Sequence, residues 1–290
     1  MMESIRIESA DLVLSSSHCV AKGAKIPKGA IHICYCHTPM RYLWGYEKEY
    51  FGSMAWPLRM LARFFLRNLK NTDLKSNERV HSFIANSINV QSRIQKFYQR
   101  DAVVIYPPLD THCYRLPDPK KEDGDYYLVV SAFVPYKRVD LVIEAFNALD
   151  RRLLIVGSGP LAVRYKGLRK SDKISFLGSV SNPELQKLYA GARALIFPTE
   201  EDFGIVPLEA QACGTPVIAF GKGGALESVK SGFLFSEQTP EAIRKAVLEF
   251  EQKSFDRDRI PAMMASFSKD CFKEQLSRFV EEVLSHSHAV

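Results

Sequence analysis

Several signals are missing from this 290-residue chain, and each absence excludes a class of protein. No apolar run approaches the roughly 20 residues that a membrane-spanning helix needs, and the start shows no signal-peptide pattern. The six cysteines form no CxxC pair and are most simply reduced core residues of an intracellular chain. No RNA- or DNA-binding signature accompanies the basic residues. We therefore expect a cytoplasmic protein that does not bind nucleic acid.

The composition that is present fits a folded protein with a basic surface. Hydrophobic residues make up 46% of the chain and charged residues 25%, which permits a real core and argues against disorder. A length of 290 residues is enough for two domains of ordinary size. The net charge of +6 favours polyanionic partners, such as nucleoside diphosphates or anionic lipid surfaces.

Residues 126–235 alternate between apolar strand segments and helical segments joined by short linkers. This alternation predicts an α/β fold with a doubly wound parallel sheet, in which ligands collect at the carboxyl ends of the strands. The expected strands are 127–131, 153–157, 173–178, 194–198, 216–220 and 233–235, with helices at 141–146 and 182–190.

A linker rich in proline and charge at 106–125 separates this region from an N-terminal part that also has an α/β pattern. We predict an N-terminal domain over 1–112 and a C-terminal domain over 113–265, the second of which holds the ligand-binding end of the doubly wound sheet. A final helix over 266–290 is expected to pack back toward the N-terminal domain. The expected N-terminal strands are 12–15, 31–36, 82–86 and 103–105.

The most informative stretch is TEEDFGIVPLEAQACGTP, which follows the apolar strand at 194–198. Pro207 suits a first helical turn, and Gly214 marks the end of that helix. Free backbone N–H groups and the helix dipole at the helix start suit a phosphate. Glu201 precedes this start and Glu209 lies within the first turns, so their carboxylates flank one ligand. The pattern predicts a nucleotide-sugar site.

Glu201 and Glu209, with seven residues between them, match the paired-glutamate motif of retaining glycosyltransferases of family 4. The flanking residues resemble that family's signature almost letter for letter, and the resemblance is strongest from Val130 to Val229. It implies the GT-B arrangement of two Rossmann-like domains, the C-terminal one holding the donor and the N-terminal one the acceptor. It also implies that Glu201 contacts the donor sugar and Glu209 the ribose hydroxyls.

Two further segments resemble functional segments of the family. VPYKRVDL resembles the one whose lysine grips the donor phosphates, which assigns that role to Lys137. Family members often carry an arginine five residues earlier, where this chain has Ala132, and Arg138 is the candidate substitute. CHTPMRY resembles the strand-end segment with a histidine near the reacting sugar, so His37 joins the catalytic candidates.

The resemblance also assigns contacts to the donor. The segment FLG at 176–178 resembles the loop whose backbone contacts the base, and a turn such as GSGP at 157–160 is common there. This turn lacks the third glycine of a dinucleotide fingerprint and so does not argue for NAD. The donor-binding candidates are Arg138, Gly157, Phe176, Leu177, Gly178, Phe203, Gly204, Ile205, Val206 and Glu209.

The resemblance implies transfer of a hexose from a nucleoside diphosphate sugar to a glycan or lipid-linked acceptor, with retained anomeric configuration. Mannose from GDP-mannose is favoured, because the chain resembles polysaccharide mannosyltransferases of bacteria and archaea, and UDP-sugars stay open. No metal cofactor is expected, because cationic side chains and a helix terminus supply the positive charge. An epimerase of GT-B form is disfavoured, because its expected catalytic acids are not evident.

Family members normally open with a strand, a glycine-rich loop and two or more βα units that have no counterpart before Asp11. Roughly the first third of the N-terminal domain is therefore expected to be absent. A truncated product, or half of a split transferase, stays open as an alternative. The chain would then be a nonenzymatic nucleotide-sugar binder or one subunit of an enzyme.

Residues 56–70 form a candidate basic amphipathic helix, with Arg59, Arg63 and Arg67 at four-residue spacing. One interpretation is a solvated charged face. The other is peripheral docking on the anionic inner face of a membrane, where a lipid-linked acceptor would sit.

The cluster His32, Cys34, Cys36 and His37 also has two interpretations. Strand alternation places the first three on one face, which fits either core residues or zinc ligands. No second ligand pair is evident, which favours the core.

Overall fold

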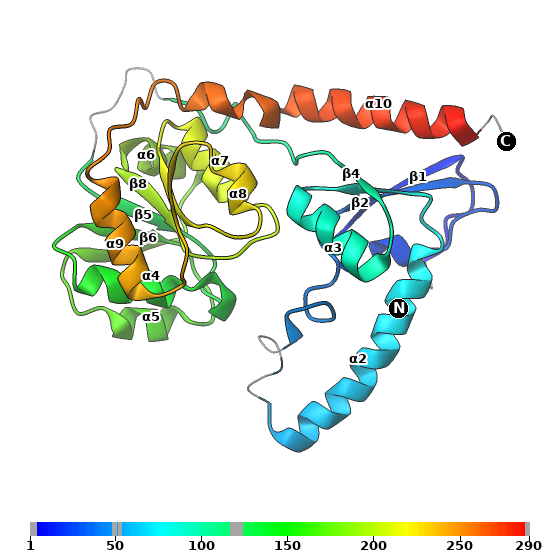
Figure 1. The fold of residues 1–290 in the computed structure, drawn as a ribbon, viewed down its shortest axis with the longest axis horizontal. Helices are drawn as coiled ribbons and strands as arrows, with labels where there is room; N and C mark the ends of the chain where they lie inside the picture. The colour runs from blue at the N-terminus through cyan, green and yellow to red at the C-terminus, as the bar shows by residue number, and fades with distance from the viewer. Residues whose placement is uncertain (1–4, 48–50, 52–53, 117–123, 288–290) are drawn as a thin grey trace. The chain divides into compact units, whose positions relative to one another are not determined.

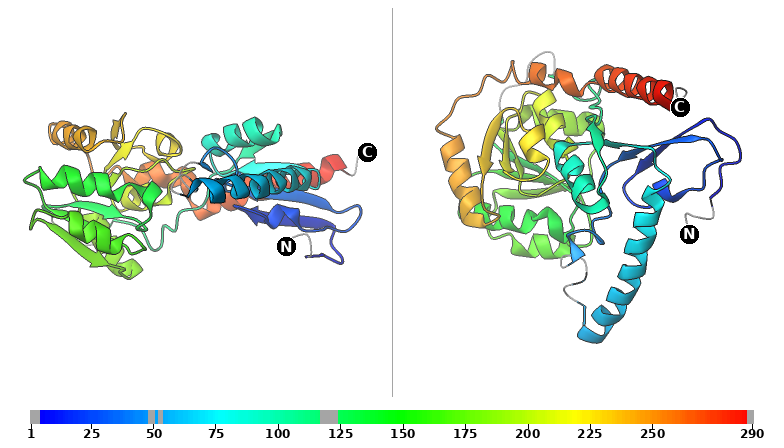
Figure 2. Two further views of the ribbon diagram at one scale, coloured as in Figure 1. Left: turned by 90° about the horizontal axis from the view of Figure 1, so that it is seen from below. Right: turned by 45° about the vertical axis from the view of Figure 1, so that its right-hand side comes forward.

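The computed structural model describes residues 5–47, 51, 54–116 and 124–287. The chain divides into two compact units (Figures 1 and 2), which we describe separately. Met1–Tyr106 with Phe272–Val290 forms the smaller unit, and Pro107–Cys271 forms the larger one. A parallel sheet of four strands lies in the smaller unit and one of six strands in the larger. The predicted α/β fold class is confirmed.

The sheet of the larger unit has the strand order β10-β9-β8-β5-β6-β7. All residues of β6, β8 and β9 are buried, which is the continuous apolar run that a sheet covered on both faces requires. The strands are β5 (Tyr127–Val130), β6 (Leu153–Val156), β7 (Ile174–Gly178), β8 (Ala194–Phe197), β9 (Val217–Phe220) and β10 (Gly232–Phe235).

Helices cover both faces of this sheet (Figure 1). One face packs against α4 (Val139–Asn147), α5 (Ala162–Leu168) and α9 (Pro240–Phe250), and the other against α6 (Asn182–Gly191), α7 (Ile205–Ala212) and α8 (Ala225–Ser228). Two 3-10 segments, η3 (Pro135–Lys137) and η4 (Pro261–Phe267), complete the unit. The helix predicted from Pro207 and Gly214 is present as α7, and Gly214 follows it with φ +78°.

The strand order reverses beside β5. The next two strands in the chain, β6 and β7, extend the sheet on one side, whereas β8, β9 and β10 extend it on the other. Right-handed crossovers then place the helices of the two halves on opposite faces, so the loops after β5 and β8 diverge. This switch point positions the candidate site.

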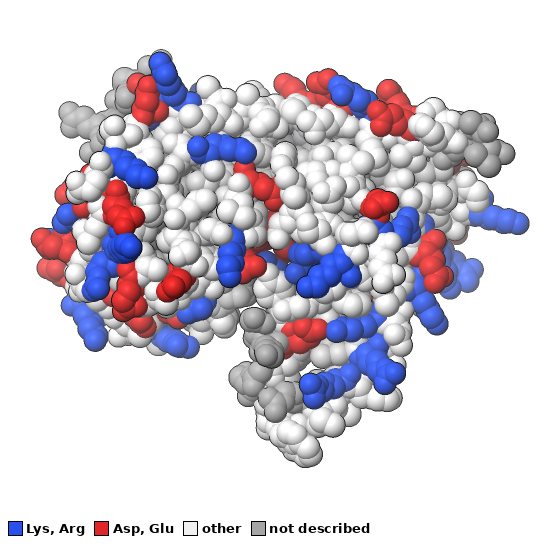
Figure 3. All heavy atoms as spheres, in the orientation of Figure 1, with Lys and Arg blue, Asp and Glu red and all other residues white. Residues whose placement is uncertain are grey.

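The sheet of the smaller unit has the order β1-β2-β3-β4, with all pairs parallel. Alternation along β2 places Ile33 on the face that α10 covers and Cys34 on the face that α3 covers. The elements are β1 (Leu12–Ser17), η2 (Ala21–Gly23), β2 (Ile31–Cys36), α2 (Trp56–Asn77), β3 (Ser82–Ala85), α3 (Ile88–Tyr98), β4 (Ala102–Val104) and α10 (Lys269–Ser287). On the face drawn in Figure 3, lysine and arginine side chains are interspersed with acidic ones.

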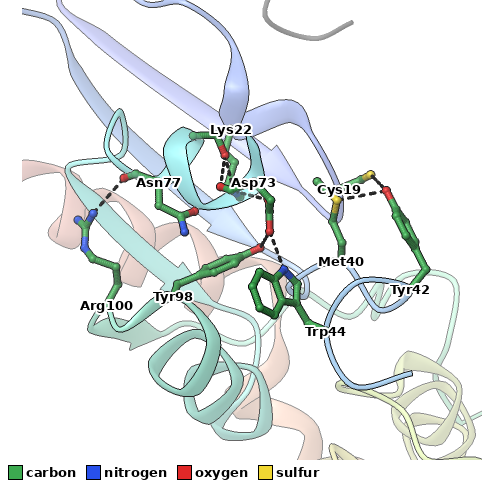
Figure 4. Close-up of polar contacts among 10 residues, drawn as sticks. Cys19, Lys22, Met40, Tyr42, Trp44, Asp73, Asn77, Tyr98 and Arg100 are labelled. Carbon is green, nitrogen blue, oxygen red and sulfur yellow. Dashed lines mark hydrogen bonds and ion pairs between the residues drawn. The ribbon is translucent and has the colours of Figure 1, made fainter. Parts of the chain in front are cut away.

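A buried ion pair fixes the C-terminal part of α2 to η2 (Figure 4). Lys22 Nζ lies 2.6 Å from Asp73 Oδ1, and their side chains are 2% and 0% exposed. Trp44 Nε1 and Tyr98 Oη donate to Asp73 Oδ2 at 2.7 and 2.9 Å. Burial, together with the Asp73 charge, raises the pKa of Tyr98, so its hydroxyl remains a donor. Both oxygens of this buried carboxylate are therefore satisfied.

Removing the charge of Asp73 is expected to destabilise the smaller unit. Asp73→Asn leaves the Lys22 ammonium buried without a counter-charge, a change that costs about 3–5 kcal/mol in the free energy of unfolding. Urea unfolding followed by tryptophan fluorescence measures this loss, because Trp44 belongs to the network. Lys173→Met, which removes an exposed pair with Asp150, is the control. Equal unfolding midpoints for the two variants would contradict the prediction.

Candidate active site

A cavity of about 380 Å³ lies at the carboxyl end of the larger unit's sheet, at the switch point between β5 and β8. The ends of β5, β6 and β8 contribute to its wall, as do the loop after β7 and the first turn of α7. Val130 and Phe197, near the ends of the two strands that flank the switch point, both line it. The cavity is therefore placed where doubly wound sheets bind ligands.

Lys137 and Glu201 meet beside this cavity. Lys137 ends η3, after β5, and Glu201 follows β8. The Lys137 ammonium forms an ion pair with Glu201 Oε1, and the two side chains keep 22% and 18% of their surface exposed. Thr199 Oγ1 donates to the Tyr136 carbonyl at 3.1 Å and so ties the same two loops together. A cation and a carboxylate thus lie side by side, partly open to solvent.

Two glycines allow the loops around the site to approach closely. Gly157 has φ +132°, and a Cβ there would lie 1.9 Å from the Ser131 carbonyl oxygen. A Cβ on Gly224 would lie 2.2 Å from Phe203 Cα, and the Gly224 N–H donates to the Glu201 carbonyl at 2.8 Å. The loop after β9 therefore holds the backbone that carries Glu201.

The start of α7 contributes backbone N–H groups. Gly204 precedes the helix with φ +95°, and as a glycine it places no capping side chain over the first turn. Val206 lines the cavity and Ile205 is exposed. A helix start of this kind favours an anion. Phe203 is buried against Phe267, with ring centroids 5.9 Å apart, so its ring belongs to the core.

Glu209 is half-buried one turn after Val206, and its carboxylate has a partner that the sequence pattern did not indicate. Tyr189 Oη donates to Glu209 Oε2 at 2.9 Å, and Tyr114 is a second hydrogen-bond donor. Burial raises the pKa of Glu209, and the two tyrosine hydrogen bonds oppose this shift. The structure therefore directs part of this carboxylate toward α6.

The structure places Arg138 outside the cavity lining. Its backbone is left-handed, with φ +53°, and its Nε lies 3.6 Å from Asp140 Oδ1. Ala132, at the position where family 4 often has arginine, does line the cavity. Among the lining residues that the structure describes, Lys137 is the only lysine or arginine. The role of Arg138 as a second cationic clamp stays a prediction.

The segment 176–178, which is expected to contact the base, forms the end of β7 and lies next to the cavity rather than in its wall. The Gly157 N–H donates to the Gly178 carbonyl at 2.8 Å, and only Gly157 of this pair lines the cavity. Phe176 packs against Phe133, with ring centroids 6.2 Å apart, and the side chain of Leu177 is 40% exposed. Three serines that the sequence pattern did not indicate also line the cavity. Each lies just after a strand, and a small polar residue at such a position is the signal that could have predicted them. They are Ser131, Ser158 and Ser179.

His37 follows β2 in the smaller unit. Its Nε2 lies 2.8 Å from Ser16 Oγ. Burial, with a contribution from His18, lowers its pKa, so the imidazole is neutral at pH 7. Its role near the reacting sugar stays a prediction.

The zinc interpretation of the same segment is not supported. The two ring nitrogens of His32 lie 2.8 Å from Ser15 Oγ and 3.1 Å from the Arg79 carbonyl oxygen. Within the described ranges, no three His, Cys, Asp or Glu side chains are grouped so that they hold a metal ion. Cys34 and Cys36 pack in the core under α3.

Comparison with known proteins identifies the family. Residues 114–263 match the family described as glycosyl transferases group 1. The chain is also similar to the GDP-mannose-dependent alpha-(1-6)-phosphatidylinositol monomannoside mannosyltransferase of Mycobacterium tuberculosis, at 32% identity over 74% of this chain and 61% of that protein. This chain belongs to the group 1 glycosyltransferases, and the predicted relationship to family 4 is confirmed.

Solved structures share the fold. Sucrose-phosphate synthase from Thermosynechococcus elongatus matches with a TM-score of 0.72 at 16% identity, over 95% of this chain and 74% of that one. A crystal structure of Anabaena HepE in complex with UDP matches with a TM-score of 0.68 at 19% identity. The match covers 87% of this chain and 72% of that one. The chain spans 52% and 61% of the length of two curated relatives that it matches.

The tight approach at Gly157 yields a stability prediction. Gly157→Ala places a methyl group against the Ser131 carbonyl in a strained backbone and is expected to destabilise the larger unit by about 2–4 kcal/mol. Gly167→Ala is the matched control, because a Cβ there meets no atom within 4 Å and α5 gains about 0.5–1 kcal/mol of helix propensity. Thermal unfolding measures both variants. A Gly157→Ala protein as stable as the control would show that the approach is looser than described.

Proposed function

We propose that this chain transfers a hexose from a nucleoside diphosphate sugar to a hydroxyl of a glycan or lipid-linked acceptor, with retained anomeric configuration. The observation that carries the proposal is the Lys137–Glu201 pair beside a cavity at the switch point, with the start of α7 in the cavity wall. A lysine and a helix start together suit a diphosphate, and carboxylates beside them suit sugar hydroxyls.

The reaction requires charge stabilisation on the departing nucleoside diphosphate. Lys137 and the N–H groups at the start of α7 supply it, because preorganised donors act where charge develops. In the structure the Lys137 ammonium is paired with Glu201. When the diphosphate takes over this ammonium, the Glu201 carboxylate is released to accept hydrogen bonds from the donor sugar. Glu209 then serves the ribose hydroxyls.

We favour mannose from GDP-mannose as the donor. Its support is the GDP-mannose-dependent activity by which the Mycobacterium tuberculosis relative, 32% identical to this chain, is named. The UDP bound in the Anabaena HepE structure makes UDP-sugars the second donor class to test.

On the acceptor side, the first part of α2 exposes an apolar face. Arg63 and Arg67 are exposed along the same part of the helix. Within the described residues, no helix combines the length and the hydropathy that crossing a bilayer requires. The exposed apolar side chains are Trp56, Leu58, Met60, Leu61, Phe64, Phe65 and Leu69.

We infer that this helix docks on an anionic lipid surface. Apolar side chains beside cationic ones are the arrangement of helices that lie in the membrane interface, where the arginines meet anionic headgroups. The C-terminal part of α2 is held within the smaller unit, because Asp73 pairs with Lys22. A lipid-linked acceptor would be presented at the same surface.

Transfer assays test the proposed reaction. With GDP-mannose and a polyprenyl-diphosphate-linked glycan, Lys137→Ala is expected to lower kcat/KM by roughly 100–1000-fold, the usual effect of losing one preorganised donor. Glu201→Gln should also lower kcat, because the amide lacks the negative charge that accepts hydrogen bonds from the donor sugar. The side chain keeps nearly the same size, so packing is preserved. Lys173→Ala, which removes an exposed lysine paired with Asp150, should transfer at the wild-type rate.

Undiminished transfer by both site variants would rule the assignment out. Wild-type protein that binds GDP-mannose but neither transfers nor hydrolyses it would instead support the nonenzymatic binder.

Vesicle co-sedimentation tests the docking of α2. The wild-type chain should bind vesicles rich in phosphatidylglycerol and not vesicles of phosphatidylcholine alone. Phe64→Ser combined with Phe65→Ser should weaken binding at least about tenfold, because each buried aromatic ring contributes roughly 1.5–3 kcal/mol. Val163→Ser, at a side chain 85% exposed on α5, is the control.

Equal binding to both vesicle types, or wild-type binding by the double variant, would contradict the inference. A concentration-dependent dimer that only the double variant abolishes would show that a second copy covers this face.

A further inference from the structure

We propose that Tyr189 and Tyr114 are positioning residues for ribose recognition, because their hydroxyl groups hold the Glu209 carboxylate ready to accept hydrogen bonds from the 2′- and 3′-hydroxyls of the donor nucleotide. The inference rests on the proposed function, in which a nucleoside diphosphate occupies the cavity at the switch point.

The two tyrosines converge on one carboxylate from outside its helix. Tyr189 comes from α6, and its Oη lies 2.9 Å from Glu209 Oε2. The Tyr114 hydroxyl is the second donor to the same carboxylate. The two rings pack edge to face, with their centroids 5.9 Å apart. Glu209 is therefore held by a pair of phenols rather than by a charge.

Tyr189 is itself fixed in place. Its side chain is fully buried, and its carbonyl accepts a hydrogen bond from Thr215 Oγ1. Thr215 is also fully buried, and its Oγ1 accepts from Arg257 at 3.0 Å. The backbone and ring of Tyr189 are thus held by surrounding residues in addition to the contact that its hydroxyl makes with Glu209.

Glu209 is placed to reach a nucleotide in the cavity. Val206, three residues earlier on α7, lines the cavity. Residues three apart in a helix share a face, so Glu209 faces the same side one turn further along. It remains half-buried rather than closed off.

A hydroxyl on a buried aromatic ring indicates a role beyond packing, because phenylalanine fills the same space without a polar group to satisfy. Burial raises the pKa of Tyr114 to about 12 and raises that of Tyr189 well above its ordinary value, so both remain donors at neutral pH. Their hydrogen bonds favour the ionised form of Glu209 against the effect of burial. An ionised carboxylate only accepts, which is the form that two ribose hydroxyls require.

Preorganisation is the physical benefit of this arrangement. A free glutamate side chain samples several rotamers, and fixing one of them on binding weakens affinity. The tyrosines fix the rotamer before the nucleotide arrives. Loss of one hydroxyl should therefore weaken recognition of the ribose specifically and leave the phosphate contacts intact.

Calorimetric titration with two nucleotide pairs tests the proposal on the full chain. The probes are GDP against 2′-deoxy-GDP, and UDP against 2′-deoxy-UDP. The wild type should bind the ribonucleotide of its preferred base about tenfold more tightly than the deoxynucleotide. Tyr189→Phe should lose most of this ratio of ribonucleotide to deoxynucleotide affinity. The variant should bind the ribonucleotide more weakly and the deoxynucleotide as tightly as the wild type does. Glu209→Gln should do the same.

Tyr165→Phe is the matched control, because Tyr165 is a buried tyrosine of the same unit whose hydroxyl donates to the Val134 carbonyl at 3.3 Å. It should keep the full ratio. If Tyr189→Phe weakens both nucleotides equally, the tyrosine has only a packing role and the proposal is overturned. It is equally overturned if Tyr189→Phe keeps the wild-type ratio.

Different results would overturn the proposed function and the role of the tyrosines. A wild-type chain that binds GDP and UDP no better than their deoxy forms would show that Glu209 does not recognise ribose, while leaving the diphosphate site intact. A wild-type chain that binds none of the four nucleotides would overturn the proposed function and this inference with it.

Discussion

The ion pair between Lys137 and Glu201 is the interaction on which the candidate site depends. It joins the loop after β5 to the loop after β8, the two strands between which the order of the sheet reverses. At this point the chain leaves toward opposite faces, so the loops diverge and their ends stay accessible. A partly exposed pair contributes only about 0–1 kcal/mol to stability. That low cost of separation suits two groups that must change partners when an anionic ligand arrives.

A second lysine–carboxylate pair in the same chain shows what burial changes. Lys22 and Asp73 are almost fully buried, and Trp44 and Tyr98 donate to the carboxylate oxygen that Lys22 does not bind. A pair of this kind is costly to break because each charge left alone in the interior is uncompensated. It therefore anchors α2, whereas the exposed pair remains available for exchange. Both pairs join a lysine to a carboxylate, so burial and not the kind of charge distinguishes the structural pair from the exchangeable one.

Much of the fold could be predicted because its signals are local. Parallel strands covered on both faces require short apolar runs, and the runs in residues 126–235 are present as β5 to β10. Pro207 and Gly214 punctuate α7 through their own backbone preferences. The family relationship rests on the same local string. The assignments of Glu201, Lys137 and His37 to catalytic roles remain predictions, because side-chain contacts alone do not reveal a reaction.

The sequence by itself determined the strands, the start and end of α7, and the family, since each follows from residues that are neighbours along the chain. Only the tertiary structure decided that Glu209 meets Tyr189, which is 20 residues away, and that Arg138 turns to Asp140 while Ala132 faces the cavity. It also decided that the Phe203 ring belongs to the core. The physical reason is that a side chain chooses its partner by distance and burial, and both are set by how the helices pack rather than by the local pattern.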